Sequence, residues 1–451
     1  MLLWGRLYHP NFASKQIKMR HIFALITFGL MQIAMAQDHI TISLEEVLIK
    51  VQESNASIKV SDQEAKMAKY DYRFSNSVFL PQIAVSHTGM ATTNPLMAFG
   101  SKLNQGILTQ ADFNPDLLND PNQVKNFATV VSVQQPLINL DGFYQRKAAK
   151  TTLEAKELQA MRTRDYLNFE AQKAYGQLQL AYRAVEVIQK AFDASTANLN
   201  MAQNSYDQGL LQKADLLEVK VRVTEVSDQL KTAKSNVQNA SDYLSFLMNE
   251  QGNIVFEPTQ ELLPENIGEE VDATLENRAD VKAMDLVSEA YKANMKADNM
   301  TFLPKLNAFA SYEMYDDQLF QADAKGYIVG ASLSWDVFKG SQRFAKAGKS
   351  KTSYEKAKQE YEQYVAKSTM ELQRTKRMVE DAESRLQTSK LAMEQSEESL
   401  RIRTNRFKEG LEKTTDLLMA EATYAEKQLA YYQTIFEYNQ AQSLLTFLTK
   451  E

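Results

Sequence analysis

Residues 205–217 read SYDQGLLQKADLL, and residues 405–418 read NRFKEGLEKTTDLL. Each segment carries a glycine, a leucine directly after it, and an Asp-Leu-Leu run that begins six residues later (215 − 209 and 416 − 410). A second motif recurs in the same order, as FLPQI at 79–83 and FLPKL at 302–306. Motifs that recur in the same order indicate one supersecondary unit used twice, so the chain is a tandem duplication.

The residues before each glycine show apolar or small side chains at alternating steps of three and four. In the first copy this pattern runs over 171–206, and a shift of 201 residues (410 − 209) places the same pattern over 372–407. After the first glycine a similar pattern resumes over 219–247. Such heptad spacing is typical of helices that pack along one face. Each copy is therefore predicted to form a helix, a tight turn and a returning helix.

The two outgoing helices are predicted to be unusually long. Segments 141–208 and 341–409 contain no proline, and at a rise of about 1.5 Å per residue each would extend roughly 100 Å. Many positions of the pattern are Ala, Ser or Thr, which allows close helix approach and favours a layer of packed helices over a two-stranded zipper. A dimeric coiled coil remains the alternative on this pattern alone.

Residues 327–337 alternate with a period of two, which predicts a β-strand at about 326–337. One face of this strand is apolar and the other is mostly small and polar, as in a transmembrane barrel with lipid outside and water inside. The residues expected to contact lipid are Tyr327, Val329, Leu333 and Trp335. The same alternation predicts three further strands, weakly at about 80–90 and 127–137 and more clearly at about 305–314. A soluble hairpin packed on the helices is the alternative. The connecting segments 91–126 and 315–325 are polar or acidic and are expected to face outward.

Four strands of this length cannot close a barrel, because closure needs roughly eight or more. The sequence therefore predicts an oligomer.

The N-terminus has the order of a signal peptide. Lys18 and Arg20 precede an apolar run over 22–35, which ends in Ala-Met-Ala at 34–36. We expect cleavage after Ala36, with Met19 as an alternative start. No later run of about 20 apolar residues is present, so any membrane span is expected to be made of β-strands.

The composition argues against catalysis and against nucleic-acid binding. The 451 residues include no cysteine and only four histidines, none of them beside a carboxylate cluster with ligand spacing. No metal, cofactor or catalytic residue is therefore expected, and the chain is not predicted to be an enzyme. The 51 Lys and Arg and the 57 Asp and Glu are interspersed, so no basic surface is available for nucleic acid.

The repeated Leu-Pro motif and the two turns from glycine to Asp-Leu-Leu are accompanied by Arg278-Ala279-Asp280-Val281 before a helix and by ISLEEV at 42–47. In this order, the motifs resemble the TolC-like outer-membrane efflux protein family over about 40–449. The resemblance implies a mostly α-helical fold with transmembrane β-strands. Long helical hairpins would form a periplasmic α-barrel, and four strands per protomer would enter the twelve-stranded outer-membrane barrel of a homotrimer. The expected divisions are a signal peptide at 1–36, a first repeat at 37–250, a linker or equatorial segment at 251–277, and a second repeat at 278–451.

The resemblance implies passive export of small molecules through an exit duct in the bacterial outer membrane, with a periplasmic extension. The implied partners are two further copies of the chain, outer-membrane lipid, a periplasmic membrane-fusion adaptor, and an inner-membrane pump of resistance-nodulation-division or ABC type. Type I protein secretion uses the same kind of duct and remains an alternative. A periplasmic coiled-coil adaptor or structural protein is the alternative of a different class.

In this family the two glycine turns form periplasmic tips that gate the duct. Asp416 matches an acidic position that lines the closed aperture, whereas Met419 stands at the second such position, and Glu412 or Glu421 is the alternative second acid. In the family a basic residue of the second tip forms a salt bridge with an aspartate of the first, and Asp215 matches that aspartate. Glu412 stands here in place of the basic residue, so the salt bridge is absent in this form. Arg406 and Lys413 are the alternative partners for Asp215. The expected aperture group is Asp416, Glu412, Asp215 and Phe407, where Phe407 replaces a tyrosine.

The tips also have simpler structural explanations. Asp215 with Glu218 fits a capping box that starts the returning helix, and both glycines fit left-handed helix C-caps. Apolar side chains in an exposed turn favour contacts with an adaptor or between tips. The expected docking group is Gly209, Leu210, Leu211, Gly410, Leu411 and Thr415.

Overall fold

The computed structural model describes residues 38–265 and 275–450. The expected signal peptide and the alternative start at Met19 lie outside the described residues. The described chain divides into two compact units, one of residues 38–55, 167–265 and 378–443, the other of residues 56–166, 275–377 and 444–450. Within the described ranges, no helix has the length and apolar character needed to cross a membrane.

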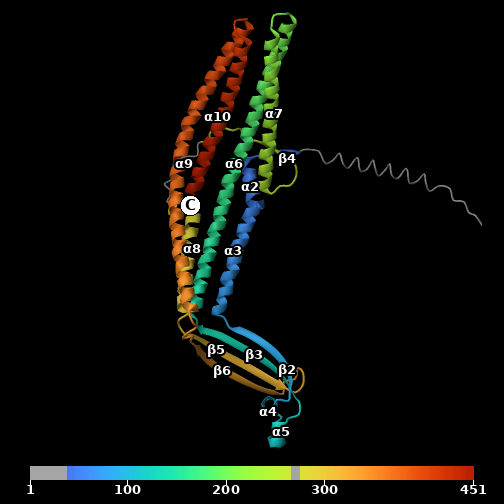
Figure 1. The fold of residues 1–451 in the computed structure, drawn as a ribbon, viewed down its shortest axis with the longest axis vertical. Coiled ribbons are helices and arrows are strands. Elements are labelled where there is room, and N and C mark those ends of the chain that lie inside the picture. The colour runs from blue at the N-terminus through green and yellow to red at the C-terminus, as the bar shows by residue number, and fades with distance from the viewer. Residues whose placement is uncertain (1–37, 266–274, 451) are drawn as a thin grey trace, which may run out of the picture. The chain divides into compact units, whose positions relative to one another are not determined.

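The fold is mostly helical, as predicted, with two small sheets (Figure 1). In chain order the elements are β1 (Asp38–Ile42), α2 (Leu44–Ser54), α3 (Ala56–Ser75), η2 (Asn76–Val78), β2 (Gln82–Thr92), α4 (Pro95–Asn104), η3 (Gln110–Phe113), α5 (Pro115–Asn119), β3 (Val124–Ile138), α6 (Leu140–Asp207), α7 (Lys213–Met248), β4 (Ile254–Pro258), η4 (Leu275–Asn277), α8 (Ala279–Met300), β5 (Lys305–Asp316), β6 (Ala324–Ser334), α9 (Gln342–Lys408) and α10 (Thr414–Thr449).

The predicted helical hairpins are confirmed. Helix α6 turns back into α7, and α9 turns back into α10 (Figure 1). The heptad positions predicted over 372–407 are all buried or half-buried, and on α6 and α7 Leu178 and Leu244 are fully buried. The sequence pattern therefore identifies the packing faces as well as the helices.

The unit that contains the hairpin turns also holds a two-stranded parallel sheet that sequence reasoning missed. Strand β1 pairs with β4 from Asp38↔Ile254 to Ile42↔Pro258. Phe256 is buried, and its backbone N–H donates to Oγ of Ser241 over 3.1 Å. The segment expected as a linker therefore contributes a strand to this unit. Strands of five residues are too short for alternation to reveal them.

The other unit contains a four-stranded antiparallel sheet in the order β2-β3-β5-β6 (Figure 1). Residues paired across antiparallel strands project to the same face. The register therefore joins the predicted apolar positions into one continuous face, through the paired sets Val85↔Val131, Val131↔Tyr312 and Tyr312↔Tyr327. On β6, Tyr327, Val329 and Leu333 are 76%, 72% and 70% exposed in the single chain.

The expectation for the end of the fourth strand was wrong, because β6 ends at Ser334 and not at residue 337. Trp335 lies just beyond it, where its indole N–H donates to the backbone oxygen of Phe302 over 3.0 Å. This hydrogen bond fixes Trp335 at the sheet end next to the helices and not within the ladder.

The segment between β2 and β3 is more ordered than its composition suggested, since it contains α4, η3 and α5. Asn94 caps α4 through its side chain and Asn114 caps α5, and a proline follows each of them as the first helical residue. Asn-Pro pairs are a recognised helix-start signal that this segment carries twice.

Candidate functional site: the helix tips

Both hairpin turns are built around a glycine in the left-handed conformation. Gly209 and Gly410 each have φ of 72°. After the first glycine, the N–H of Leu210 donates to the oxygen of Ser205 over 2.8 Å, and after the second the N–H of Leu411 donates to that of Arg406 over 2.9 Å. These bonds across five residues are Schellman closures, so the predicted C-cap role of both glycines is confirmed.

The capping box expected at Asp215 is wrong. Helix α7 begins at Lys213, its N-cap is Gln212, and no side chain caps it. The N–H of Leu216 already donates to the oxygen of Gln212 over 3.3 Å, so the helical ladder closes before Asp215 could cap it. Asp215 instead lies in the first turn of α7, as Asp416 lies in the first turn of α10. Each carboxylate there faces the positive end of the helix dipole.

The leucines of the two turns differ in environment. Leu210 is 77% exposed and Leu411 is 66% exposed. Leu211 is instead partly buried and packs against apolar side chains of α6, α7 and α10. Of the three apolar candidates for docking, the exposed two are therefore the ones available to a partner. Thr415, in the first turn of α10, is also exposed.

An apolar cluster joins the two hairpins just behind their tips. The tip cluster consists of Ala202 from α6, Leu216 and Val219 from α7, and Leu418 from α10. Leu216, Val219 and Leu418 are 5%, 0% and 7% exposed. Since Leu418 belongs to the second hairpin, separating the hairpins would expose this surface to water.

Glu412 is held inside its own turn by two arginines. Its carboxylate lies 2.7 Å from Nη1 of Arg403 and 2.8 Å from Nε of Arg406, and Arg406 also donates to the oxygen of Leu411 over 3.3 Å. The hydrogen bond from Arg406 and the charge of both arginines lower the pKa of Glu412, against the opposing effect of desolvation. Arg406 thus pairs with Glu412 and not with Asp215, and the pairing leaves Asp416 as the stronger acidic candidate for an aperture.

A second link between the hairpins is polar. The side-chain amide of Asn198 on α6 donates to Oε1 of Glu421 on α10 over 2.8 Å. Burial raises the pKa of Glu421, while the bond from Asn198 and the charge of Arg222 oppose that rise. Sequence reasoning named Glu421 but missed its partner. A signal existed, because Asn198 lies 11 residues before one turn glycine (209 − 198) and Glu421 lies 11 residues after the other (421 − 410).

The remaining aperture candidates lie near the second turn. Asp416 and Phe407 are half-buried, and Met419 is 70% exposed. Within residues 38–265 and 275–450, no group of three or more His, Asp or Glu side chains is placed to hold a metal ion.

The chain matches the family described as Outer membrane efflux protein over residues 47–250 and 271–449. Comparison with curated protein sequences gives no match. Solved structures share the fold at low identity. A membrane protein from Pseudomonas aeruginosa has a TM-score of 0.79 at 15% identity, with 90% of this chain and 93% of that chain covered.

Two named outer membrane proteins are also similar in structure. The CmeC outer membrane channel of Campylobacter jejuni has a TM-score of 0.77 at 14% identity, with 90% of this chain and 85% of that chain covered. The outer membrane protein VceC of Vibrio cholerae has a TM-score of 0.76 at 17% identity, with 90% and 95% covered. The family is one of transport proteins, and its match spans most of the sequence. The chain belongs to the outer membrane efflux protein family and is a TolC-like efflux channel of the bacterial outer membrane.

Proposed function

We propose that three copies of this chain form one exit duct, which is gated at the two hairpin turns and docked there by a periplasmic adaptor linked to an inner-membrane pump. The duct passes small molecules without altering them. The observation that carries the proposal is the sheet of four strands, because it leaves β2 and β6 as edges in the described chain.

An open sheet edge is not stable in a bilayer, since its backbone groups find no water there. Strands β2 and β6 run in opposite directions within the sheet. Strand β6 of one copy can therefore pair with β2 of the next in the antiparallel sense, and three copies would close a ring of twelve strands. The apolar face carrying Tyr327, Val329 and Leu333 would then contact lipid, with Trp335 at its helix-side border.

The proposed docking surface comprises the exposed leucines Leu210 and Leu411 with Thr415. These side chains project from turns whose shape depends on Gly209 and Gly410. An apolar residue held in a rigid exposed turn loses little freedom on binding, which favours its use as an anchor. A pump of either proposed type, resistance-nodulation-division or ABC, would reach the duct through the adaptor bound there.

The proposed aperture is a ring of Asp416 from three copies. Threefold symmetry repeats one carboxylate into three, and such a ring attracts cations and repels anions. Glu412 does not add to this charge in the single chain, because Arg403 and Arg406 neutralise it.

Assembly can be tested by disulfide trapping, since the natural chain has no cysteine. Cysteine pairs placed one in β2 and one in β6, such as Ser86→Cys with Ser332→Cys and neighbouring registers, should give covalent dimers and trimers on oxidation. The control pair Ser132→Cys with Ser311→Cys joins residues already paired between β3 and β5, so it should give only a cross-link within one chain. Monomers at every β2–β6 register would refute the ring.

Fractionation gives an independent test. The protein should sediment with outer membranes and run as a trimer on gels unless heated, and particles extracted in detergent should show threefold symmetry. A soluble periplasmic monomer or dimer would instead support the coiled-coil adaptor.

A further inference from the structure

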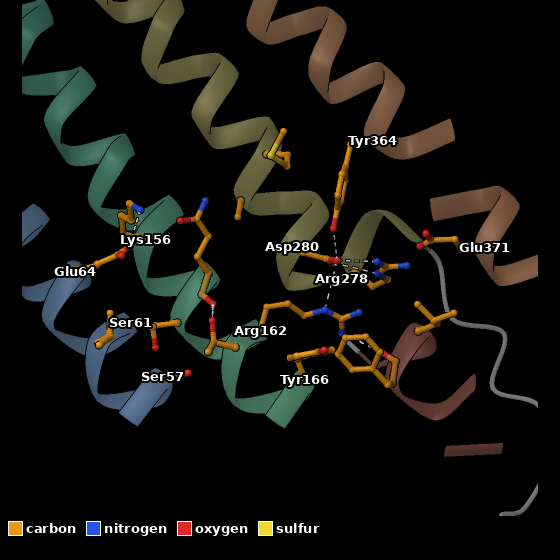
Figure 2. A pocket seen from close by; sticks show the side chains of 18 of the residues that line it. Ser57, Ser61, Glu64, Lys156, Arg162, Tyr166, Arg278, Asp280, Tyr364 and Glu371 are labelled. Carbon is orange, nitrogen blue, oxygen red and sulfur yellow. Dashed lines mark hydrogen bonds and ion pairs between the residues drawn. The ribbon is translucent and has the colours of Figure 1, made fainter. Parts of the chain in front are cut away.

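A pocket of about 760 Å³ lies in the unit that contains the four-stranded sheet, and none of the tip residues lines it. Its walls come from α3, α6, α8, α9 and the last turns of α10 (Figure 2). Its apolar lining includes Val60, Met284 and Leu448, and Tyr166 and Phe447 add aromatic surface. The volume lies in the range of sites for small organic ligands. Neither the channel nor its gate accounts for it.

One side of the pocket carries a compact charged cluster, the arginine cluster, of Arg162, Arg278, Asp280 and Tyr364 (Figure 2). Arg278 binds Asp280 with two bonds, Nε to Oδ1 over 3.1 Å and Nη2 to Oδ2 over 2.6 Å. The hydroxyl of Tyr364 donates to Oδ2 over 2.7 Å, and Nε of Arg162 lies 3.4 Å from the same oxygen. Two guanidinium groups therefore share one carboxylate.

Both guanidinium groups are deeply buried. Arg278 is 2% exposed and Arg162 is 8% exposed. An arginine keeps its charge in a protein, so the cluster holds one buried positive charge that Asp280 does not balance. Such a charge is costly without a further partner.

Several guanidinium N–H groups of the arginine cluster also lack a hydrogen-bond acceptor. Among the described residues, Nη1 of Arg278 and both Nε and Nη2 of Arg162 are buried without a hydrogen-bond acceptor. The remaining nitrogen of Arg162, Nη1, donates to the backbone oxygen of Phe447 over 2.9 Å, and its guanidinium carbon lies 3.6 Å from the centre of the Phe447 ring. The aromatic ring covers one side of the guanidinium but accepts no conventional hydrogen bond.

The other charges around the pocket are already paired. Glu64 lies 2.8 Å from Lys156, and Glu371 lies 3.8 Å from Lys367. Asp165, which acts on Arg162 through its charge, lies 2.6 Å from Lys450. These pairs leave the excess positive charge of the arginine cluster in place.

We propose that this pocket binds a small organic carboxylate with an apolar body. The acid group would accept hydrogen bonds from Arg162 and Arg278 and neutralise the cluster, after a small movement of the Phe447 ring. The apolar body would lie along Val60, Met284 and Leu448. Guanidinium groups suit this role because their planar fork matches carboxylate geometry.

The test uses full-length protein in lipid nanodiscs and 2-naphthoate as the probe, measured by isothermal titration calorimetry. The neutral 2-naphthylmethanol and the cationic 2-naphthylmethylamine have the same aromatic body and report on charge. We expect one saturable naphthoate site per chain, with the alcohol and the amine at least tenfold weaker. Equal binding of all three probes, or none of naphthoate, would overturn the proposal.

Two substitutions locate the site. Arg162→Gln removes the excess charge and should weaken naphthoate at least tenfold. Val60→Trp fills the pocket without touching the arginine cluster and should abolish binding, whereas Val221→Trp, an equally exposed valine on α7 outside the pocket, should leave it unchanged. A trimer band that is present on gels of unheated samples and lost on heating confirms that each variant is assembled. If the Arg162→Gln variant fails to assemble, the comparison of Val60→Trp with Val221→Trp tests the site. Naphthoate binding that is retained in Val60→Trp would refute it.

Discussion

Asn198 on α6 donates its amide hydrogen to the carboxylate of Glu421 on α10 over 2.8 Å, and so ties the two helical hairpins together behind their tips. The bond lies in the same unit as the tip cluster, where Leu418 of α10 packs on Leu216 and Val219 of α7. In the family a charged pair is expected at the tips. In this chain the hairpins are instead held there by an apolar contact and one half-buried carboxyl.

Glu421→Gln should change the pH dependence of stability. Burial raises the pKa of Glu421, so the folded chain keeps this proton at a pH where the unfolded chain has lost it. The contribution of Glu421 to stability is therefore most favourable below 4.5, the ordinary pKa of a glutamate, and declines as pH rises through the raised pKa of the folded chain. Glutamine keeps the acceptor without the charge, so the variant should unfold at an equal or higher temperature at pH 7, with the gain shrinking towards pH 4.

Circular dichroism melts from pH 4 to pH 8 measure this effect. Glu426→Gln removes a largely exposed carboxylate on the same helix and should show no such trend. A Glu421→Gln variant that melts well below the natural protein at pH 7 would contradict the assignment.

Gly410→Val should destabilise the second tip. A residue at φ of 72° is left-handed, and a β-branched side chain there costs about 1–2 kcal/mol or more. Gly410→Asn should be milder, because asparagine tolerates this region. Limited proteolysis at the turn measures the change, with Gly348→Val in the body of α9 as the control. Equal protease resistance of the valine and asparagine variants would show that the turn does not require its φ.

Asp280→Asn should weaken the unit that contains the arginine cluster. Burial alone would raise the pKa of Asp280, but hydrogen bonds from Arg278 and Tyr364 and the charge of Arg162 outweigh it and lower the pKa to about 2. The ionised group therefore stabilises the fold above pH 3.8, the ordinary value, and this contribution is lost as pH falls towards 2. At 1.36 kcal/mol per pH unit the contribution is about 2 kcal/mol.

Thermal melts at pH 7 should rank Asp280→Asn as the more severe change and Tyr364→Phe as the milder one, since the latter removes a single hydrogen bond worth about 1 kcal/mol. An asparagine variant as stable as the natural chain would mean that the cluster is not neutralised through this carboxylate.

Leu210→Asp combined with Leu411→Asp should abolish adaptor docking while leaving the trimer intact. A charge placed in an apolar contact must be desolvated on binding, which typically costs several kcal/mol. Cells expressing the double variant should lose efflux-dependent resistance but show normal trimers in the outer membrane. Val221→Asp, an exposed site on α7, is the matched control. Full resistance in the double variant would exclude these leucines as anchors.

Asp416→Ala should reduce block of single channels by divalent cations. Removing one carboxylate per chain removes three from a symmetric ring, so half-block should need several-fold more Mg²⁺ in bilayer recordings. Glu409→Ala removes another carboxylate near the same turn, where Glu409 is exposed, and should have little effect. Unchanged conductance and unchanged block in Asp416→Ala would discard the aperture role.

The helices and turns of this protein were determined by the sequence itself. A heptad pattern repeated at a fixed offset predicts both long hairpins, and glycines at 209 and 410 mark their ends, because these signals depend only on neighbours along the chain. The alternation over residues 327–333 reveals an apolar strand face for the same reason. The five-residue strands β1 and β4 carried too little pattern to be predicted.

Only the tertiary structure decided which distant residues meet. Arg162 and Asp280 are 118 residues apart (280 − 162), so no local pattern indicates this contact. Asn198 and Glu421 are 223 apart (421 − 198) and lie at equal distances from the two turn glycines, but only the packing of the hairpins brings them within hydrogen-bonding distance. Glu412 pairs with Arg403 and Arg406 because of the way the chain closes the second turn. Helix α7 begins at Lys213 because its backbone hydrogen bonds begin there. Local periodicity determines which face of a helix is apolar, whereas the pairing of buried polar groups depends on which segments pack together, because each group needs a partner of matching charge and geometry within hydrogen-bonding distance.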